Sequence, residues 1–125
     1  MANEISARAY LTCTKDGTTV TGDTTYSYTL TGSQKWTNTQ TIGTTTEQLA
    51  FPSDLTTEGI SFFWVKNLDT TNYVDVATAT PATTHIFTKL KAGQVAVFPS
   101  PTANPTFYAI ANTAAVNLQI VAVGT

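Results

Sequence analysis

The second half of the chain is a succession of short apolar and β-branched runs, each closed by a turn signal. The runs cover residues 59–68, 73–77, 86–90, 94–98, 107–111 and 116–123. Short runs of this kind, spaced about 8–12 residues apart, are typical of a β-sandwich or barrel. No long helical period interrupts them, and three prolines between Pro99 and Pro105 predict a loop. This half therefore predicts antiparallel sheets.

The first half alternates apolar and polar residues more regularly. Residues 5–14 alternate, and Asp16-Gly17 supplies the positive φ angles that a tight hairpin turn needs. Residues 24–31 and 36–42 predict further strands, and residues 52–59 mark a break that has room for one helical turn capped by Ser53. We expect a single all-β domain over residues 1–125, an antiparallel β-sandwich of jelly-roll type with eight to ten strands. Residues 1–8 are a candidate N-terminal arm.

The core is predicted from the apolar runs. Residues 62–65 have no polar face, so their strand should be central and buried on both sides. The expected core residues are Phe62, Trp64, Val74, Val76, Phe87, Leu90, Val95, Val97, Ile110, Leu118 and Ile120.

The amino-acid composition limits the classes of partner that we expect for this chain. Only 11% of the residues are charged and 28 of the 125 are threonine. Hydroxyl groups rather than charges therefore make the surface hydrophilic. Such a surface gives up charge repulsion between copies and suits a protein that sits against other copies or another protein. A net charge of −2 argues against nucleic acid, and no apolar segment is long enough to span a membrane. The plain N-terminal sequence lacks a signal-peptide pattern, which favours synthesis in the cytoplasm.

No residue pattern predicts catalysis, so we expect no enzyme, no cofactor and no metal site. His85 is the only histidine and is interpreted as an exposed residue at a strand edge, whereas Cys13 is interpreted as a small buried hydrophobe. A calcium loop needs several oxygen ligands at regular close spacing, and Asp69 and Asn72 are only two such groups, three residues apart. They therefore predict an Asx turn between two strands.

The aromatic residues leave alternatives open. Seven aromatic side chains could line a sugar-binding face, although core packing explains most of the aromatic residues. The seven are Tyr10, Tyr26, Tyr28, Trp36, Tyr73, Phe107 and Tyr108. Trp36, flanked by Lys35 and Thr37, is an interface anchor, a ligand platform or a ring folded back over the edge of the sandwich.

Three segments carry a resemblance to a known group of proteins. Residues 66–74, 89–98 and 108–121, with residues 1–5 and 40–44, resemble small structural proteins of tailed bacteriophages. Together these segments comprise 43 of the 125 residues. The motifs are turns and a small-residue hairpin, so the resemblance implies a virion component and no active site.

The resemblance favours a capsid decoration (cement) protein that binds the major capsid protein on the virion surface. A tail or neck structural protein and a carbohydrate-binding adsorption module are the alternatives. Because Val121 and Val123 are apolar positions on the second face of the last strand, we also expect a homo-oligomer, with a trimer preferred. The candidate interface residues are Ala2, Asn3, Glu4, Ile5, Trp36, Asp54, Leu55, Glu58, Val121 and Val123.

Overall fold

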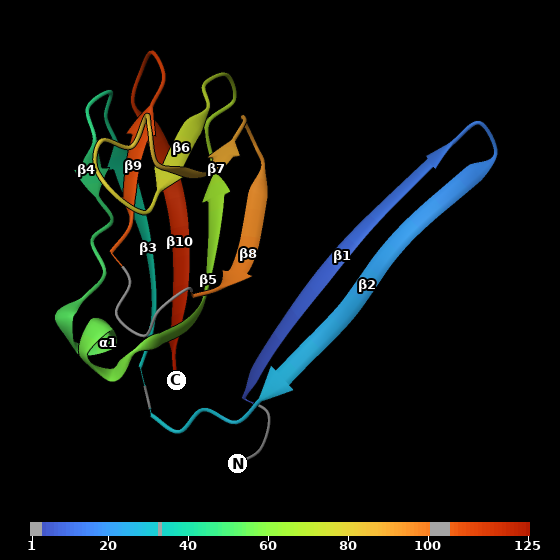
Figure 1. Cartoon of the computed structure of the whole chain (residues 1–125), viewed down its shortest axis with the longest axis horizontal. Coiled ribbons are helices and arrows are strands. Elements are labelled where there is room, and N and C mark those ends of the chain that lie inside the picture. The colour runs from blue at the N-terminus through green and yellow to red at the C-terminus, as the bar shows by residue number, and fades with distance from the viewer. Residues whose placement is uncertain (1–3, 33, 101–105) are drawn as a thin grey trace. The chain divides into compact units, whose positions relative to one another are not determined.

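The computed structural model describes residues 4–32, 34–100 and 106–125, and divides the chain into two compact units, residues 1–31 and 32–125 (Figure 1). The elements in chain order are β1 (Ile5–Lys15), β2 (Thr18–Tyr28), β3 (Lys35–Ile42), β4 (Glu47–Gln48), α1 (Ser53–Glu58), β5 (Ile60–Asn67), β6 (Val74–Ala77), β7 (Ile86–Leu90), β8 (Val95–Pro99), β9 (Tyr108–Ala111) and β10 (Val116–Gly124). The predicted all-β architecture and strand number are confirmed.

The first unit is a β-hairpin. β1 and β2 pair antiparallel over eleven residues each, from Ile5 opposite Tyr28 to Lys15 opposite Thr18. Asp16 and Gly17 close the turn with φ angles of 52° and 76°, as a tight hairpin turn requires. From the sequence, these strands were predicted to be part of the sandwich. In the structure they form a two-stranded sheet of their own.

The second unit is a sandwich of two four-stranded antiparallel sheets, ordered β3-β10-β5-β8 and β4-β9-β6-β7. The first of its strands pairs with the last, the second with the next to last, and so on inward to the β6–β7 pair. This nested pairing, with the pairs alternating between the two sheets, is the arrangement of an eight-stranded jelly roll. The predicted jelly-roll sandwich is therefore found in residues 32–125.

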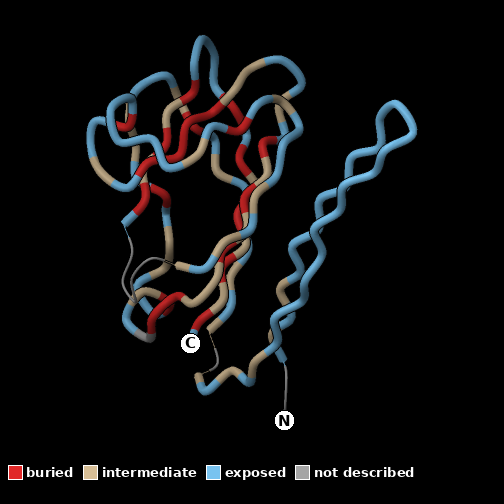
Figure 2. Tube along the Cα trace, turned by 45° about the vertical axis from the view of Figure 1, so that its right-hand side comes forward, coloured by how far each residue is buried: buried red, intermediate tan, exposed pale blue. Residues whose placement is uncertain are grey.

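Alternating side chains from both sheets fill the core. Val116, Leu118, Ile120 and Ala122 of β10 all point inward and are fully buried. Phe63 lies at the centre of an aromatic cluster, with its ring centroid 3.9 Å from that of Phe98 and 4.3 Å from that of Phe107. In Figure 2 the buried positions recur along the strands of the sandwich.

The predicted core was only partly right. Val74, Val76, Leu90, Leu118 and Ile120 are buried as expected. The other predicted core residues are half-buried or exposed: Phe62, Trp64, Phe87, Val95, Val97 and Ile110.

For β5, the prediction chose the wrong set of alternate residues as the inward-facing ones. β5 does lie between two neighbouring strands, but Phe63 and Val65 point inward, and Phe62 and Trp64 therefore point to the other face of the sheet.

The expected helical turn is present but starts differently. α1 has six residues, its N-cap is Pro52, and no side chain caps it, so the prediction of Ser53 as the cap was wrong. Leu55 lies in the sandwich core with no exposed surface. The break expected at residues 52–59 therefore contains a short helix anchored by its leucine.

Candidate interaction surfaces

The hairpin has two chemically different faces because residues alternate along both strands. We call one the apolar hairpin face. It consists of Ile5, Ala7, Ala9, Leu11, Cys13, Val20, Gly22, Thr24, Tyr26 and Tyr28. Leu11 is 76% exposed and Val20 is 65% exposed, values expected for a face with no second layer over it. Figure 2 shows exposed positions along nearly the whole length of both strands.

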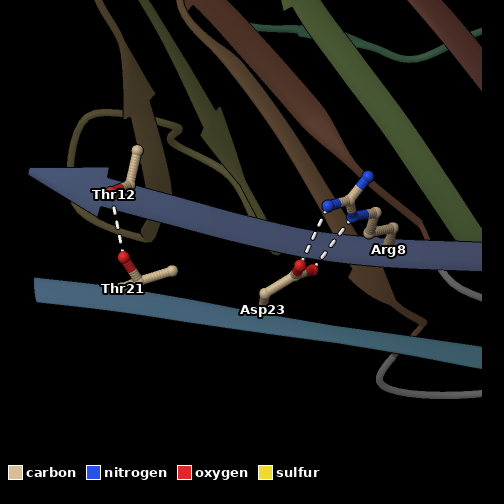
Figure 3. A network of polar contacts seen from close by, with 4 residues as sticks. All are labelled: Arg8, Thr12, Thr21 and Asp23. Atoms are coloured by element: carbon tan, nitrogen blue, oxygen red, sulfur yellow. Dashed lines mark hydrogen bonds and ion pairs between the residues drawn. The ribbon is translucent and has the colours of Figure 1, made fainter.

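The opposite hairpin face is polar and holds the two strands in register. Arg8 donates two hydrogen bonds of 2.9 Å from Nε and Nη2 to the carboxylate oxygens of Asp23, diagonally across the strands (Figure 3). This bidentate pairing raises the pKa of Arg8. Thr12 and Thr21 stand directly opposite each other, with their hydroxyl oxygens 3.0 Å apart. The polar face therefore fixes the register, while Leu11 and Val20 on the apolar face are largely exposed.

A hairpin built this way gains little from burial. An isolated two-stranded hairpin is only marginally stable in water, because one sheet without a second layer buries almost no apolar surface. Cys13, predicted as a buried hydrophobe, is exposed for this reason: it does point to the apolar face, but nothing in the described part of the hairpin covers that face. Covering the apolar hairpin face would therefore stabilise the hairpin.

The sandwich has a second apolar surface, which we call the outer apolar face. It is formed by Phe62, Trp64, Val95, Val97, Pro99, Val121 and Val123, on the outward side of β10, β5 and β8. Val121 stands opposite Trp64 in the register, and Trp64 stands opposite Val97, so the side chains form a continuous row across three strands. Val95 is 52% exposed and Val97 is 39% exposed.

The outer face of the other sheet is crossed by a loop. There, the connection formed by residues 78–85 crosses in front of β9 and β6 (Figure 1), and the Ala82 amide donates to the Thr46 hydroxyl at 3.2 Å. Asp75 and Ala77, which point outward from β6, are consequently buried. Lys89 Nζ lies 3.7 Å from Asp75 Oδ1 and provides the countercharge. One sheet thus has a loop of its own across its outer side, whereas Val95 and Val97 on the outer apolar face of the other sheet are exposed.

The candidate interface residues from the sequence are scattered. Ala2 and Asn3 lie outside the described residues, and Glu4 accepts a hydrogen bond from the Leu30 amide at 3.1 Å. Ile5 belongs to the apolar hairpin face, so the expected N-terminal arm is, from residue 5 onward, one strand of the hairpin.

The remaining candidates divide between surface and core. Asp54 is exposed, and Glu58 ends α1 with a side chain outside the described part of the chain. The prediction of Leu55 as an interface residue was wrong, because its side chain is completely buried in the core and has no surface to offer a partner. Val121 and Val123 are half-buried on the outer apolar face, where the sequence placed them on the second face of the last strand.

Trp36 adopts the third of the arrangements considered for it. It points inward from β3, opposite the buried Ala122, and packs edge-on against Phe51 with the ring centroids 5.6 Å apart. It therefore closes one side of the core. Tyr10 and Tyr26 point to opposite faces of the hairpin, and Phe107 is fully buried, so these candidate sugar-binding aromatics do not share one face.

The predicted Asx turn after β5 is present. The Asp69 carboxylate accepts hydrogen bonds from the amides of Asn72 and Thr71, and these two bonds lower its pKa. Asn67, which sequence reasoning missed, organises the same turn from within the core. Its amide group donates to the carbonyl oxygens of Asn72 and Leu90, and its Oδ1 accepts from the Asp69 amide. A polar residue at the end of an apolar strand was the available signal.

The groups considered for chemistry remain separate. His85 is exposed, as predicted, and directly precedes β7, with Nδ1 3.0 Å from the Thr84 hydroxyl. Among the described residues, no three His, Cys, Asp or Glu side chains gather where they could hold a metal ion. An open hollow of about 610 Å³ lies beside α1, with Phe51, Ser53, Thr56 and Thr57 in its lining. No helix among the described residues is long and apolar enough to cross a membrane.

Comparisons with known protein families, with curated proteins and with solved structures each found no match for this chain. The resemblance to structural proteins of tailed phages therefore rests on the sequence motifs alone.

Proposed function

We propose that this chain is a structural protein that fastens to a protein lattice through its N-terminal hairpin. The observation that carries the proposal is the apolar hairpin face, with Leu11, Val20 and Tyr26 more than half exposed on a hairpin that has no core of its own. A partner that covers this face gains apolar burial and at the same time stabilises the hairpin.

The partner proposed for this face is the major capsid protein of a tailed phage, which makes the chain a capsid decoration protein on the virion surface. The phage-like motifs support the choice of partner, and the low charge of the chain suits close contact with a repeating surface. On such a lattice each contact can be weak, because many linked copies multiply the effective affinity. The jelly roll has its own core, so it can remain folded whether or not the hairpin is engaged.

The test is co-sedimentation of the full chain with undecorated capsids, using two variants that differ only in which face they change. Tyr26→Thr removes a 56% exposed ring from the apolar hairpin face, and Tyr10→Thr removes a 57% exposed ring from the polar face. We expect Tyr26→Thr to weaken capsid binding about tenfold, since about 1.4 kcal/mol of lost burial has that effect. Tyr10→Thr should change binding by less than about twofold.

Three results would contradict the proposal. Equal losses for both variants would mean that the faces are not distinguished. Binding to purified tails rather than to capsids would move the protein to the tail or neck. Binding to neither, with a signal on a glycan array, would favour the adsorption module instead.

A further inference from the structure

The edge strand β8 differs from the other edges of the two sheets. β8 borders the sheet beside β5 (Figure 1), and its five residues, Val95–Pro99, carry no charge. The opposite edge of the same sheet, β3, carries Lys35 and several threonines, and β7 at the edge of the second sheet carries Lys89. β4 is only two residues long. Charged residues, very short strands and proline are the usual protection of sheet edges, and of these β8 has only Pro99, at its last position.

The backbone of β8 presents a defined set of free groups. The Asn67 amide donates to the Gln94 carbonyl at 2.9 Å and the Ser100 amide donates to the Ser61 carbonyl at 2.7 Å, so the even-numbered residues bond to β5. Residues alternate sides in an antiparallel ladder, and therefore the amide and carbonyl groups of Val95 and Val97 point away from β5. Pro99 adds a carbonyl and no amide, which is tolerated at an edge.

We infer that β8 pairs antiparallel with β8 of a second copy of this chain, about a twofold axis at Ala96. In this register Val95 of each copy faces Val97 of the other, and the two pairs exchange four hydrogen bonds. Every outward-pointing amide of β8 is then satisfied. The two four-stranded sheets become one continuous eight-stranded sheet.

Side chains support the same register. Ala96 would face its own symmetry mate at the closely spaced, non-hydrogen-bonded position, where a small side chain fits best. Val95 and Val97 would form β-branched cross-strand pairs on the outward side, which stabilise antiparallel pairing. The two outer apolar faces, including Trp64 and Val121, would join into one surface across the axis.

A second copy fits this edge better than an unrelated strand for two reasons. The pattern of free groups on Val95 and Val97 is its own complement in the antiparallel direction, as a twofold interface requires. The strand is neutral, so two copies meet without like-charge repulsion. A twofold pair also closes on itself and leaves no β8 edge free to recruit further chains.

The experiment measures the mass of the full chain in solution by light scattering across a concentration series, with reducing agent present because Cys13 is exposed. Wild type should show twice the 13.3 kDa chain mass at high concentration. Val97→Lys places a charge at the paired edge and should raise the dimer dissociation constant at least tenfold. Thr39→Lys, on the same outward side near the opposite edge, should leave it unchanged.

Two more variants separate other modes of association. Val121→Lys alters the outer apolar face in the middle of the sheet, and Leu11→Thr alters the apolar hairpin face. A dimer that Val121→Lys or Leu11→Thr dissociates while Val97→Lys does not would overturn the inference, as would a trimer or a monomer at every concentration. Circular dichroism melting checks that each variant is folded.

Amide hydrogen exchange gives a readout independent of substitution. The amides of Val95 and Val97 should become protected only at concentrations at which the dimer forms. Rapid exchange of both amides in a sample that is fully dimeric would place the interface elsewhere.

Discussion

Leu11 in the hairpin and Leu118 in the sandwich occupy the same kind of position, an apolar residue in an alternating strand. Leu118 is fully buried, because a second sheet packs over its face, whereas Leu11 is 76% exposed. The difference lies in the number of layers and not in the local sequence. One part of the chain has completed its core within itself, and the other offers its apolar face to the surroundings.

The largest expected effect tests this contrast with one substitution made in both regions. Leu118→Ala should lower the free energy of unfolding by about 2–5 kcal/mol, because it leaves a cavity between the sheets. Leu11→Ala should change it by less than about 0.5 kcal/mol, since the side chain already contacts water. Urea denaturation followed by tryptophan fluorescence measures both. A cost above about 1 kcal/mol for Leu11→Ala would show that the hairpin is packed against something in the isolated chain.

The next largest effect on the free energy of unfolding is expected at Asn67, the buried polar residue that stabilises the turn after β5. Asn67→Ala should lower the free energy of unfolding by about 2–4 kcal/mol, because two carbonyl oxygens and one amide lose a partner at buried or partly buried positions. The matched control is Asn117→Ala. Asn117 is exposed and accepts one hydrogen bond from the Thr41 hydroxyl, so its loss should cost less than about 1 kcal/mol. Equal costs for the two variants would contradict this role for Asn67.

A smaller effect follows from the lowered pKa of Asp69. Because the backbone amides of Asn72 and Thr71 favour the carboxylate, the folded pKa lies below the unfolded value near 3.8. The stabilisation is therefore present above the unfolded pKa and is lost as the pH falls through the folded pKa. Asp69→Asn should have a flatter dependence of melting temperature on pH below pH 4 than wild type. Parallel curves for the two proteins would refute this.

The smallest effect belongs to the hairpin. Asp23→Asn removes the charge that pairs with Arg8, and both side chains are exposed, so added salt should have a similar weak effect. Cross-strand nuclear Overhauser effects between β1 and β2 should weaken, while the melting temperature of the sandwich stays the same. A lowered sandwich melting temperature would show that the two units are energetically coupled.

Local signals in the sequence were sufficient for most strands. The run at residues 86–90 predicted β7 to the residue, and Asp16-Gly17 predicted the hairpin turn because few other pairs accept those φ angles. The nested pairing of strands joins residues far apart in the sequence. The number of strands suggested it, but no single motif did.

The misplaced residues have specific physical causes. Residues 62–65 are all apolar and do not alternate with polar residues. The sequence of this run therefore does not indicate which two of the four side chains point inward. Cys13 alternates correctly with its neighbours, but alternation reveals a face and not whether that face is covered. The interface candidates depended on the same missing information, as Leu55 and Trp36 show by packing into the core.

The pairing of β3 with β10 brings the entry and exit of the sandwich together. The Gly32 amide donates to the Thr125 carbonyl at 3.0 Å, so the polypeptide leaves the jelly roll beside the point where it came in. When the two ends of a domain lie next to each other, a short linker can join them, and new termini can then be placed in exposed loops. The jelly roll could therefore be circularly permuted with a short linker between those ends, or inserted whole into a loop of a host protein without stretching either.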